Sequence, residues 1–172
     1  MRVPEGPLVG KATVVRPATP GDVDLLVAWH ADPEVARYWD DETFTREQIE
    51  LRLRRPDVDS YVVMRDEAPV GYIQAWFDRQ SPGAGGIDMF LIPSARDRGF
   101  GPDAARTLAR WLTTSGVLSR VTVDPYAWNG RAISAWKKAG FEPEEEREAD
   151  DEHVDRWLLM RFVEAGDEHD LS

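Results

Sequence analysis

The stretch ARDRGFGPDAARTLARWL, residues 95–112, constrains the fold most, because it joins a strand-like run to a helix-like run through two closely spaced glycines. Gly101 is expected to be the N-cap of the helix and Pro102 its first residue, since proline is favoured at that position. The helix is expected to end at Gly116. Its apolar stripe consists of Ala104, Leu108, Trp111 and Leu112. The glycines therefore lie at a helix N-terminus that follows a strand.

A helix N-terminus of this kind can bind an anion, because its first backbone N–H groups have no partner within the helix and the helix dipole is positive there. Gly99 and Gly101 let a phosphate approach the backbone, and Arg96 and Arg98 add positive charge. The spacing matches neither the P-loop nor the full dinucleotide fingerprint. Taken alone, the R-x-x-G-x-G residues fit an ordinary glycine-rich turn equally well.

Short strands and helices make up the rest of the chain. Strands are expected at 11–19, 61–65, 70–77, 85–92, 119–125 and 154–163, and helices at 19–32, 45–55 and 129–140. Residues 33–41 indicate a short helix or turn, and residues 142–152 an acidic loop. Strands dominate early and strand–helix alternation late, which predicts an α+β domain with a mixed sheet.

One domain is expected, because 172 residues bury one sizeable core but are too few for two comfortable ones. The domain is expected to span residues 11–163, between a flexible N-terminus of residues 1–10 and a frayed acidic tail of residues 164–172. The chain has no cysteine, and its three histidines are scattered in the sequence, so neither a thiol nucleophile nor a metal site is predicted.

The net charge of −11 argues against nonspecific nucleic-acid binding, which depends on neutralising phosphates with Lys and Arg. A cationic partner suits this charge, although a merely solvated acidic surface fits it as well. The N-terminus lacks an apolar signal-peptide core, and no run approaches the roughly 20 apolar residues that span a bilayer. We therefore expect a soluble cytoplasmic protein without a membrane partner.

Two motifs together resemble the GCN5-related N-acetyltransferase (GNAT) superfamily: the R-x-x-G-x-G loop at 96–101 and the segment NGRAISAWKKAGF at 129–141. The resemblance implies a central mixed, mostly antiparallel sheet with a splayed parallel strand pair, flanked by helices. It implies acetyl-CoA as cosubstrate. The coenzyme would be held by the residues Met89, Phe90, Leu91, Arg96, Arg98, Gly99, Phe100, Gly101, Asn129 and Lys138.

Within the superfamily, most of the chain resembles the aminoglycoside 6'-N-acetyltransferases, through RPATPGDVDLLVAWHADPEVARYW, GYIQAWF, GID and VDPYAWNGRAISAWKKAGFE. This implies a small polyamine acceptor, with Asp88 as the catalytic base. The acceptor would be bound by Asp124, Trp39, Gln74, Tyr126 and Trp128. We expect a monomer or a homodimer.

The chemistry agrees with this assignment. A protonated alkylamine cannot attack a thioester until it loses a proton, and a nearby carboxylate can accept that proton. From the residues alone, Asp88 fits an outward-facing position on a strand, and Asp124 before Pro125 fits a turn initiator.

Trp136 departs from the family pattern, which has a tyrosine there as the usual acid for the departing thiolate. Indole is no practical acid. Either Tyr126 replaces it, or the thiolate leaves without help from the protein, which we favour, or activity is low or the substrate different. One alternative is acylation of another small amine or hydroxylamine, such as a siderophore hydroxylysine, because related sequences share the GYxQ and GID surroundings. Trp136 supports the other alternative, a catalytically silent CoA-binding module.

The remaining tryptophans divide into two groups. Trp29, Trp111 and Trp157 have core-like spacing, and we interpret them as packing residues. Trp39, Trp76 and Trp128 lie on segments expected to face the acceptor, where aromatic walls with acidic residues suit a hydroxylated polyamine.

Overall fold

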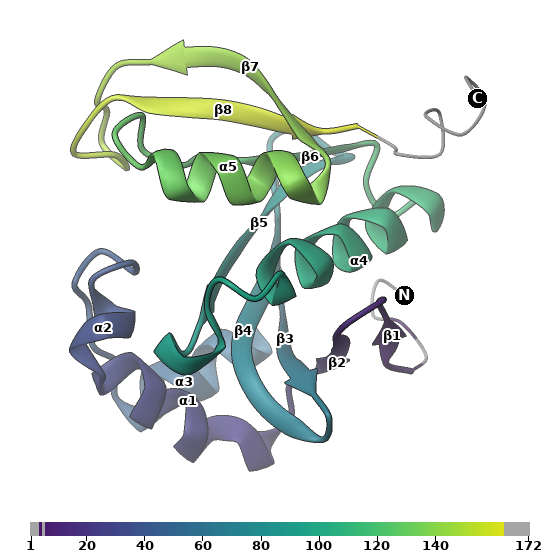
Figure 1. The fold of residues 1–172 in the computed structure, drawn as a ribbon, viewed down its shortest axis with the longest axis vertical. Helices are drawn as coiled ribbons and strands as arrows, with labels where there is room; N and C mark the ends of the chain where they lie inside the picture. Colours follow the sequence, from purple (N-terminus) through teal and green to yellow (C-terminus); the bar gives the residue numbers. More distant parts are fainter. Residues whose placement is uncertain (1–3, 5, 164–172) are drawn as a thin grey trace.

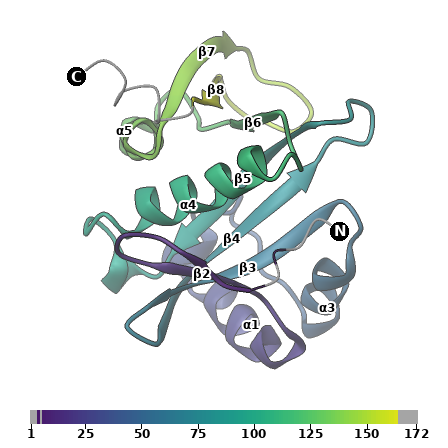
Figure 2. The same ribbon diagram turned by 90° about the vertical axis from the view of Figure 1, so that its right-hand side faces the viewer.

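The protein folds into an eight-stranded sheet with helices on both faces (Figures 1 and 2). The computed structural model describes residue 4 and residues 6–163. The strand order is β1-β2-β3-β4-β5-β6-β8-β7. The strands are β1 (Leu8–Val9), β2 (Val14–Pro17), β3 (Val58–Arg65), β4 (Ala68–Phe77), β5 (Ala84–Leu91), β6 (Arg120–Val123), β7 (Phe141–Arg147) and β8 (Trp157–Phe162). All neighbours are antiparallel except β5 and β6. The expected mixed, mostly antiparallel sheet is confirmed.

The helices divide between the two faces because side chains alternate along a strand. Ile73 and Ile87 pack in the main core, together with the buried stripe of α4 (Phe100–Thr114). Tyr72, next to Ile73 on β4, and its register partner Phe90 pack on the opposite face in a second core. That second core is built from α1 (Val23–Ala31), α2 (Pro33–Ala36) and α3 (Arg46–Arg54). The remaining helices are η1 (Pro20–Asp22), η2 (Pro93–Ala95) and α5 (Gly130–Ala139).

The parallel pair separates partway along its length. β5 pairs with β6 only from Ala84 to Gly86, whereas its pairing with β4 continues to Leu91. A Cβ on Gly86 would lie 2.4 Å from the Trp76 ring and 2.5 Å from the Thr122 carbonyl, so glycine allows the last close contact between the two strands. Beyond it, the β6 side of β5 is open, which confirms the predicted splay.

The start of α4 corrects the sequence prediction. Its N-cap is Gly99, not Gly101, and Gly99 has a φ of 82°, in the left-handed region that favours glycine. Pro102 is consequently the third helical residue, where the missing N–H is still one that has no partner within the helix. The helix ends at Thr114, before Gly116, which has a φ of 78°.

The acidic segment after Phe141 is the second correction. Phe141–Arg147 is not a loop but strand β7, paired with β8 at the edge of the sheet. Of its residues only Phe141 is buried, and the glutamates form surface ion pairs such as Glu144 with Arg120 and Glu146 with Arg156. A charged edge strand carries no apolar alternation, so the sequence pattern did not reveal it.

The N-terminal segment is the third correction, since Leu8–Val9 of the supposedly flexible residues 1–10 pairs with β2. The Asp103 carboxylate on α4 accepts hydrogen bonds from the backbone N–H groups of Lys11, Ala12 and Thr13 and from the Thr13 hydroxyl. These contacts hold the following turn against α4. The predicted frayed tail, 164–172, lies outside the described residues.

Candidate active site

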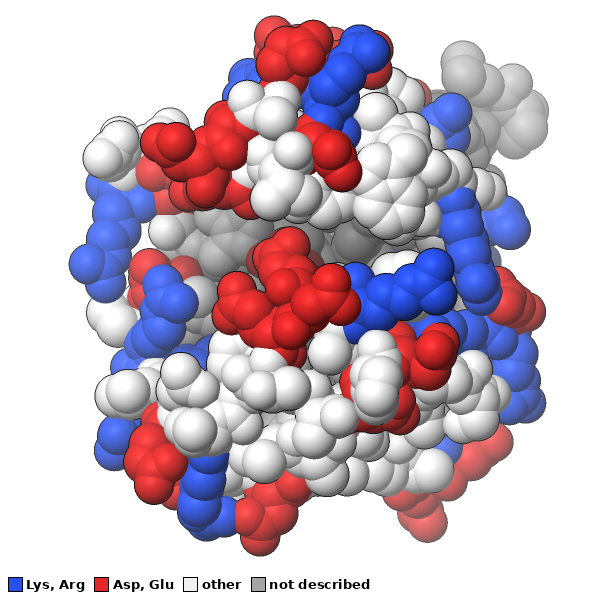
Figure 3. All heavy atoms as spheres, turned by 90° about the vertical axis from the view of Figure 1, so that its left-hand side faces the viewer, with Lys and Arg blue, Asp and Glu red and all other residues white. Residues whose placement is uncertain are grey.

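A cleft of about 830 Å³ lies along the open edge of β5. Its walls come from β5, the N-terminal end of α4, the loop after β6, the α5 helix and the segment after α2. Figure 3 shows a hollow across this face of the molecule, with acidic side chains on both sides of it. Among the acidic residues that line the cleft are Asp40, Asp88, Asp97, Asp124 and Glu152. The cleft therefore suits a cationic ligand at its acidic end.

Asp88 lies on β5 directly opposite Gln74 of β4. The Gln74 amide nitrogen donates a hydrogen bond of 3.0 Å to Asp88 Oδ2. The Tyr72 hydroxyl donates to the Gln74 carbonyl oxygen at 2.8 Å, so Ser60 Oγ, also 2.8 Å away, donates to the Tyr72 oxygen. This chain of hydrogen bonds fixes which end of the Gln74 amide faces Asp88.

Burial raises the pKa of Asp88 to about 7, and the negative charges of Asp124 and Asp40 act in the same direction. The hydrogen bond from Gln74 and the positive charge of Arg52 oppose that rise. A carboxylate with a pKa near neutrality exists in both forms at neutral pH, which is the condition under which a general base is most effective. Asp88 is thus suited to accept a proton in the cleft.

Arg52, a buried cation, lies behind the side of the cleft that contains Gln74. Arg52 of α3 is 8% exposed and donates to Nε2 of the buried His30 at 2.8 Å. Burial first, and then the Arg52 charge, lower the pKa of His30 to about 3, so His30 is neutral and can accept this bond. The guanidinium lies over the rings of Trp39, Phe44 and Tyr72 at 5.5, 4.5 and 5.2 Å. Arg52 and its aromatic neighbours support the wall that contains Trp39 and Gln74.

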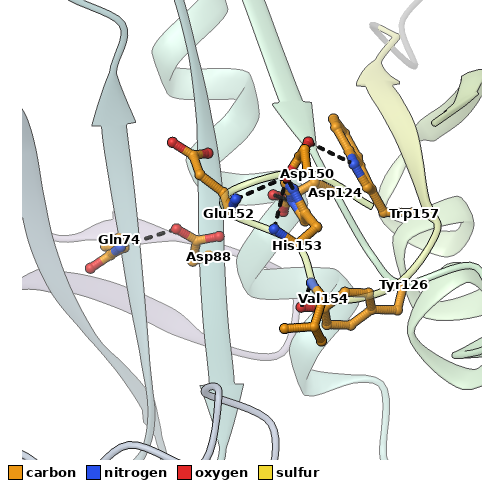
Figure 4. A network of polar contacts seen from close by, with 9 residues as sticks. All are labelled: Gln74, Asp88, Asp124, Tyr126, Asp150, Glu152, His153, Val154 and Trp157. Atoms are coloured by element: carbon orange, nitrogen blue, oxygen red, sulfur yellow. Dashed lines mark hydrogen bonds and ion pairs between the residues drawn. The ribbon is translucent and has the colours of Figure 1, made fainter. Parts of the chain in front are cut away.

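Asp124 follows β6 and contacts a residue that sequence reasoning missed. His153, in the loop between β7 and β8, has its Nε2 2.6 Å from Asp124 Oδ2 and its Nδ1 2.8 Å from Asp150 Oδ1 (Figure 4). Burial opposes a charge on His153, but the hydrogen bonds to Asp124 and then Asp150 outweigh it, and the pKa of His153 is raised. The spacing Asp150-x-x-His153 gave no signal within an acidic segment.

Of the predicted acceptor-binding aromatics, Tyr126 and Trp128 contact the same loop, whereas Trp39 packs with the second core. Trp39 and Tyr126 line the cleft, as does Gln74. Trp128 stacks on Tyr126 with ring centroids 5.7 Å apart, but it is 65% exposed and is not among the residues that line the cleft. Trp76 likewise packs over Gly86 instead of lining it. Of the tryptophans expected to pack in the core, Trp157 is buried and Trp29 and Trp111 are partly buried against the two cores.

The predicted coenzyme residues lie at the other end of the cleft. Those that line it are Met89, Phe90, Leu91, Arg96, Gly99, Gly101, Asn129 and Lys138. Arg96 donates to the backbone oxygens of Leu91 and Glu34, which fixes its side chain beside the opening. Asn129 caps α5 by accepting from the Ala132 N–H. The structure thus brings most of the predicted set together at two helix N-termini and one open strand edge.

Two of the predicted coenzyme residues, Arg98 and Phe100, lie outside the lining of the cleft. Phe100 is 5% exposed and packs in the main core, and Arg98 lies over its ring at 4.9 Å. Neither is among the residues that line the cleft. Trp136 does line it, on α5, and its ring contacts Phe141 edge-on at 5.3 Å.

A glycine-capped helix N-terminus lies beside an opened strand pair that holds the carboxylate of Asp88, an arrangement that suits an anionic ligand at one end and a cationic ligand at the other. The acetyltransferase (GNAT) domain model matches residues 19–149. The chain therefore belongs to the GNAT family of acetyltransferases, which confirms the resemblance seen in the sequence.

The relatives of this chain include an aminoglycoside N(6')-acetyltransferase type 1 from Klebsiella pneumoniae, 26% identical over 149 residues, which cover 76% of this chain and 74% of that protein. The solved structure of AAC(6')-Ib in complex with paromomycin and acetyl-CoA superposes with a TM-score of 0.80 and 24% identity, over 94% of this chain and 99% of that one. A spermidine N-acetyltransferase from Vibrio cholerae, in complex with CoA and spermine, has a TM-score of 0.76 and 13% identity, over 88% and 95% of the two chains.

Among the described residues, no helix is long and apolar enough to cross a membrane.

Proposed function

We propose that this protein transfers the acetyl group of acetyl-CoA to the 6'-amine of an aminoglycoside, a reaction that would confer resistance to the antibiotic. The observation that carries the proposal is Asp88, a carboxylate with a pKa of about 7, placed at the opening between β5 and β6 and accompanied by Asp124 and Asp40. The similarity to aminoglycoside N(6')-acetyltransferases supports the choice of acceptor. We place the reaction in the cytoplasm, as the sequence led us to expect.

The acceptor amine enters as an ammonium ion and binds between the acidic groups of the cleft, where Asp124 and Asp88 attract it. Asp88 takes one proton from the ammonium nitrogen, and the freed lone pair attacks the thioester carbon. The new C–N bond forms as the C–S bond breaks, CoA leaves as a thiolate, and the nitrogen loses its second excess proton to water, which leaves a neutral amide. The close placement of the two substrates supplies the rest of the acceleration.

Acetyl-CoA would occupy the opposite end of the cleft. Its pyrophosphate would bind the N-terminus of α4, where the left-handed Gly99 turns the backbone and Gly101 carries no side chain. Arg96 and Lys138 line this end and add positive charge. The open edge of β5 at Met89–Leu91 would hold the pantetheine arm by backbone hydrogen bonds.

The thiolate leaves without a tyrosine at position 136. An ordinary thiol has a pKa of about 8.5, so the leaving group is stable enough to depart and to be protonated by water. Tyr126 is the other candidate acid: it lines the cleft, and burial, ahead of its other interactions, raises the pKa of its hydroxyl. Trp136 is also the observation that supports a second candidate function, a CoA-binding module without turnover.

Thiol release from acetyl-CoA tests the proposal. The purified protein is assayed with kanamycin, tobramycin and amikacin, and with an aminoglycoside that carries a hydroxyl at the 6' position. We expect turnover with the three amines alone, and loss of turnover in Asp88→Asn. Coenzyme binding without turnover on any amine would favour the silent module, and turnover only on other amines or hydroxylamines would redirect the acceptor assignment.

A further inference from the structure

Both ring nitrogens of His153 face carboxylate oxygens. Nε2 lies 2.6 Å from Asp124 Oδ2, and Nδ1 lies 2.8 Å from Asp150 Oδ1. A neutral imidazole has one N–H and one lone pair, so one of these two contacts would set a lone pair against an ionised oxygen. Only the imidazolium form donates to both carboxylates.

The surroundings of His153 hold the ring in this orientation. Trp157 stacks on it with centroids 4.1 Å apart and planes 14° from parallel, and the Trp157 indole N–H donates to Asp150 Oδ2 at 3.1 Å. Asp150 Oδ1 also accepts from the backbone N–H groups of Glu152 and His153. Asp150 is therefore fixed by its own loop, and its position fixes the imidazole.

The same loop is tied to the segment that carries Asp124. The Ala127 N–H donates to the Arg156 carbonyl, the Leu158 N–H to the Pro125 carbonyl, and the Trp128 indole to Asp155. Figure 4 shows the imidazole of His153 between the two aspartates, with Asp88 on the neighbouring strand across the cleft. His153 is thus a fixed donor, whereas the Asp124 side chain is 42% exposed and would otherwise turn freely.

We propose that His153 is a positioning residue of the acceptor site: as an imidazolium clamped between Asp124 and Asp150, it fixes the Asp124 carboxylate at the cleft and offsets its negative charge. The inference deepens the proposed acetyl transfer to an aminoglycoside and rests on it. Because His153 engages one oxygen of Asp124, the acceptor ammonium binds the other. The sugar amine would then meet a carboxylate of defined orientation.

The offset of charge matters for Asp88, whose pKa responds to Asp124. The groups that face His153 are Asp124 from the β6 loop, Asp150 from its own loop, the Tyr126 ring edge-on at 6.1 Å, and Trp157 of β8. The imidazolium is the cation of this set, so its loss leaves the Asp124 charge uncompensated. Asp88 then becomes harder to ionise, while a cationic acceptor is attracted more strongly.

His153→Gln separates this role from a purely structural one, because glutamine keeps a donor but carries no charge. We expect the rising limb of the pH profile of kcat/KM to move upward by roughly half a unit, which lowers kcat/KM at pH 7 by about two-fold relative to its plateau at high pH. The KM for the aminoglycoside is expected to fall. Arg156→Gln is the matched control: it removes one positive charge from the same hairpin, at an exposed side chain paired with Glu146, and its profile should match that of the wild type.

A folded His153→Gln protein with the pH limb and KM of the wild type would overturn the proposal. A measurement independent of turnover is the ¹⁵N NMR spectrum of the imidazoles in the wild-type protein, which contains three histidines. We expect His153 to carry protons on both nitrogens at pH 7, and Asp124→Asn to lower its titration midpoint. A neutral His153 at pH 7 contradicts the inference, even if aminoglycosides prove not to be substrates.

Discussion

Replacing Tyr72 with phenylalanine tests whether the hydrogen-bond chain behind Asp88 sets the pKa of that carboxylate. The Tyr72 side chain is fully buried, and its hydroxyl contacts Ser60 Oγ and the Gln74 carbonyl oxygen, each at 2.8 Å. Tyr72→Phe leaves both partners without this bond. At about 1 kcal/mol for each lost bond, the free energy of unfolding falls by about 2 kcal/mol, which lowers Tm by roughly 4–8 °C in a domain of this size.

The effect on activity follows from the Gln74 amide. Without the Tyr72 hydroxyl, the amide is free to turn its oxygen toward Asp88, which removes the hydrogen bond that favours the charged form of Asp88. The pKa of Asp88 then rises, and the rising limb of kcat/KM moves upward by about half a unit. The assay is thiol release with kanamycin from pH 5.5 to pH 9, an interval of roughly two units around a pKa of about 7.

Ser60→Ala is the matched control, because it removes a donor to Tyr72 but leaves the bond from Tyr72 to Gln74 in place. We expect about half the loss of stability and an unshifted pH profile. If Tyr72→Phe is destabilised but its pH limb coincides with those of Ser60→Ala and the wild type, the hydrogen-bond chain does not tune Asp88.

Three further predictions concern the coenzyme site, Asp88 and the N-terminal segment. Gly99→Ala should weaken CoA binding, measured by calorimetry, because the φ of 82° at Gly99 is strained for alanine. Gly116 has a φ of 78° and equally open surroundings, so Gly116→Ala should lower the stability by a similar amount but leave the CoA affinity unchanged. The pKa of Asp88 is raised on folding, so the contribution of Asp88 to stability falls as pH rises from about 4 to about 7. Asp88→Asn should therefore raise Tm more at pH 8 than at pH 4. An equal change of Tm at both pH values would contradict this prediction. Asp103→Asn should lower the free energy of unfolding, measured in urea, by about 2 kcal/mol at pH 7 and by little near pH 2, because the hydrogen bonds that lower the pKa of Asp103 favour its charged form. The same loss at both pH values would refute a charge-dependent contact between Asp103 and the N-terminal segment.

Much of the fold was predictable from local patterns. Apolar periodicity located the helices; the helix expected at 45–55, for instance, is α3, and a capping box of Thr45 and Gln48 starts it. The cleft residues were predicted by resemblance, because the physical reading of Asp88 alone favoured a surface position. What raises its pKa is its burial together with Asp124 and Asp40, and those residues are distant in sequence and meet only in the folded chain.

Other features escaped prediction for identifiable reasons. β7 is held by pairing with β8 and by surface ion pairs, neither of which leaves a period in the sequence. The N-cap of α4 is Gly99 and not Gly101. Either glycine fits the sequence pattern of a helix start, and only the backbone conformation distinguishes the two. His153 was overlooked because its partners are a loop aspartate three residues before it and Asp124, which is brought near by the pairing of β6 with β8.

The position of the acetyl group in the reaction product tests the central claim most directly. Kanamycin is incubated with acetyl-CoA and the purified protein, and the product is analysed by mass spectrometry and by two-dimensional NMR. We predict a single acetyl group on the 6'-nitrogen, and no such product with Asp88→Asn. Acetylation of a different amine, or the same product from Asp88→Asn at an undiminished rate, would contradict the proposed site and its base.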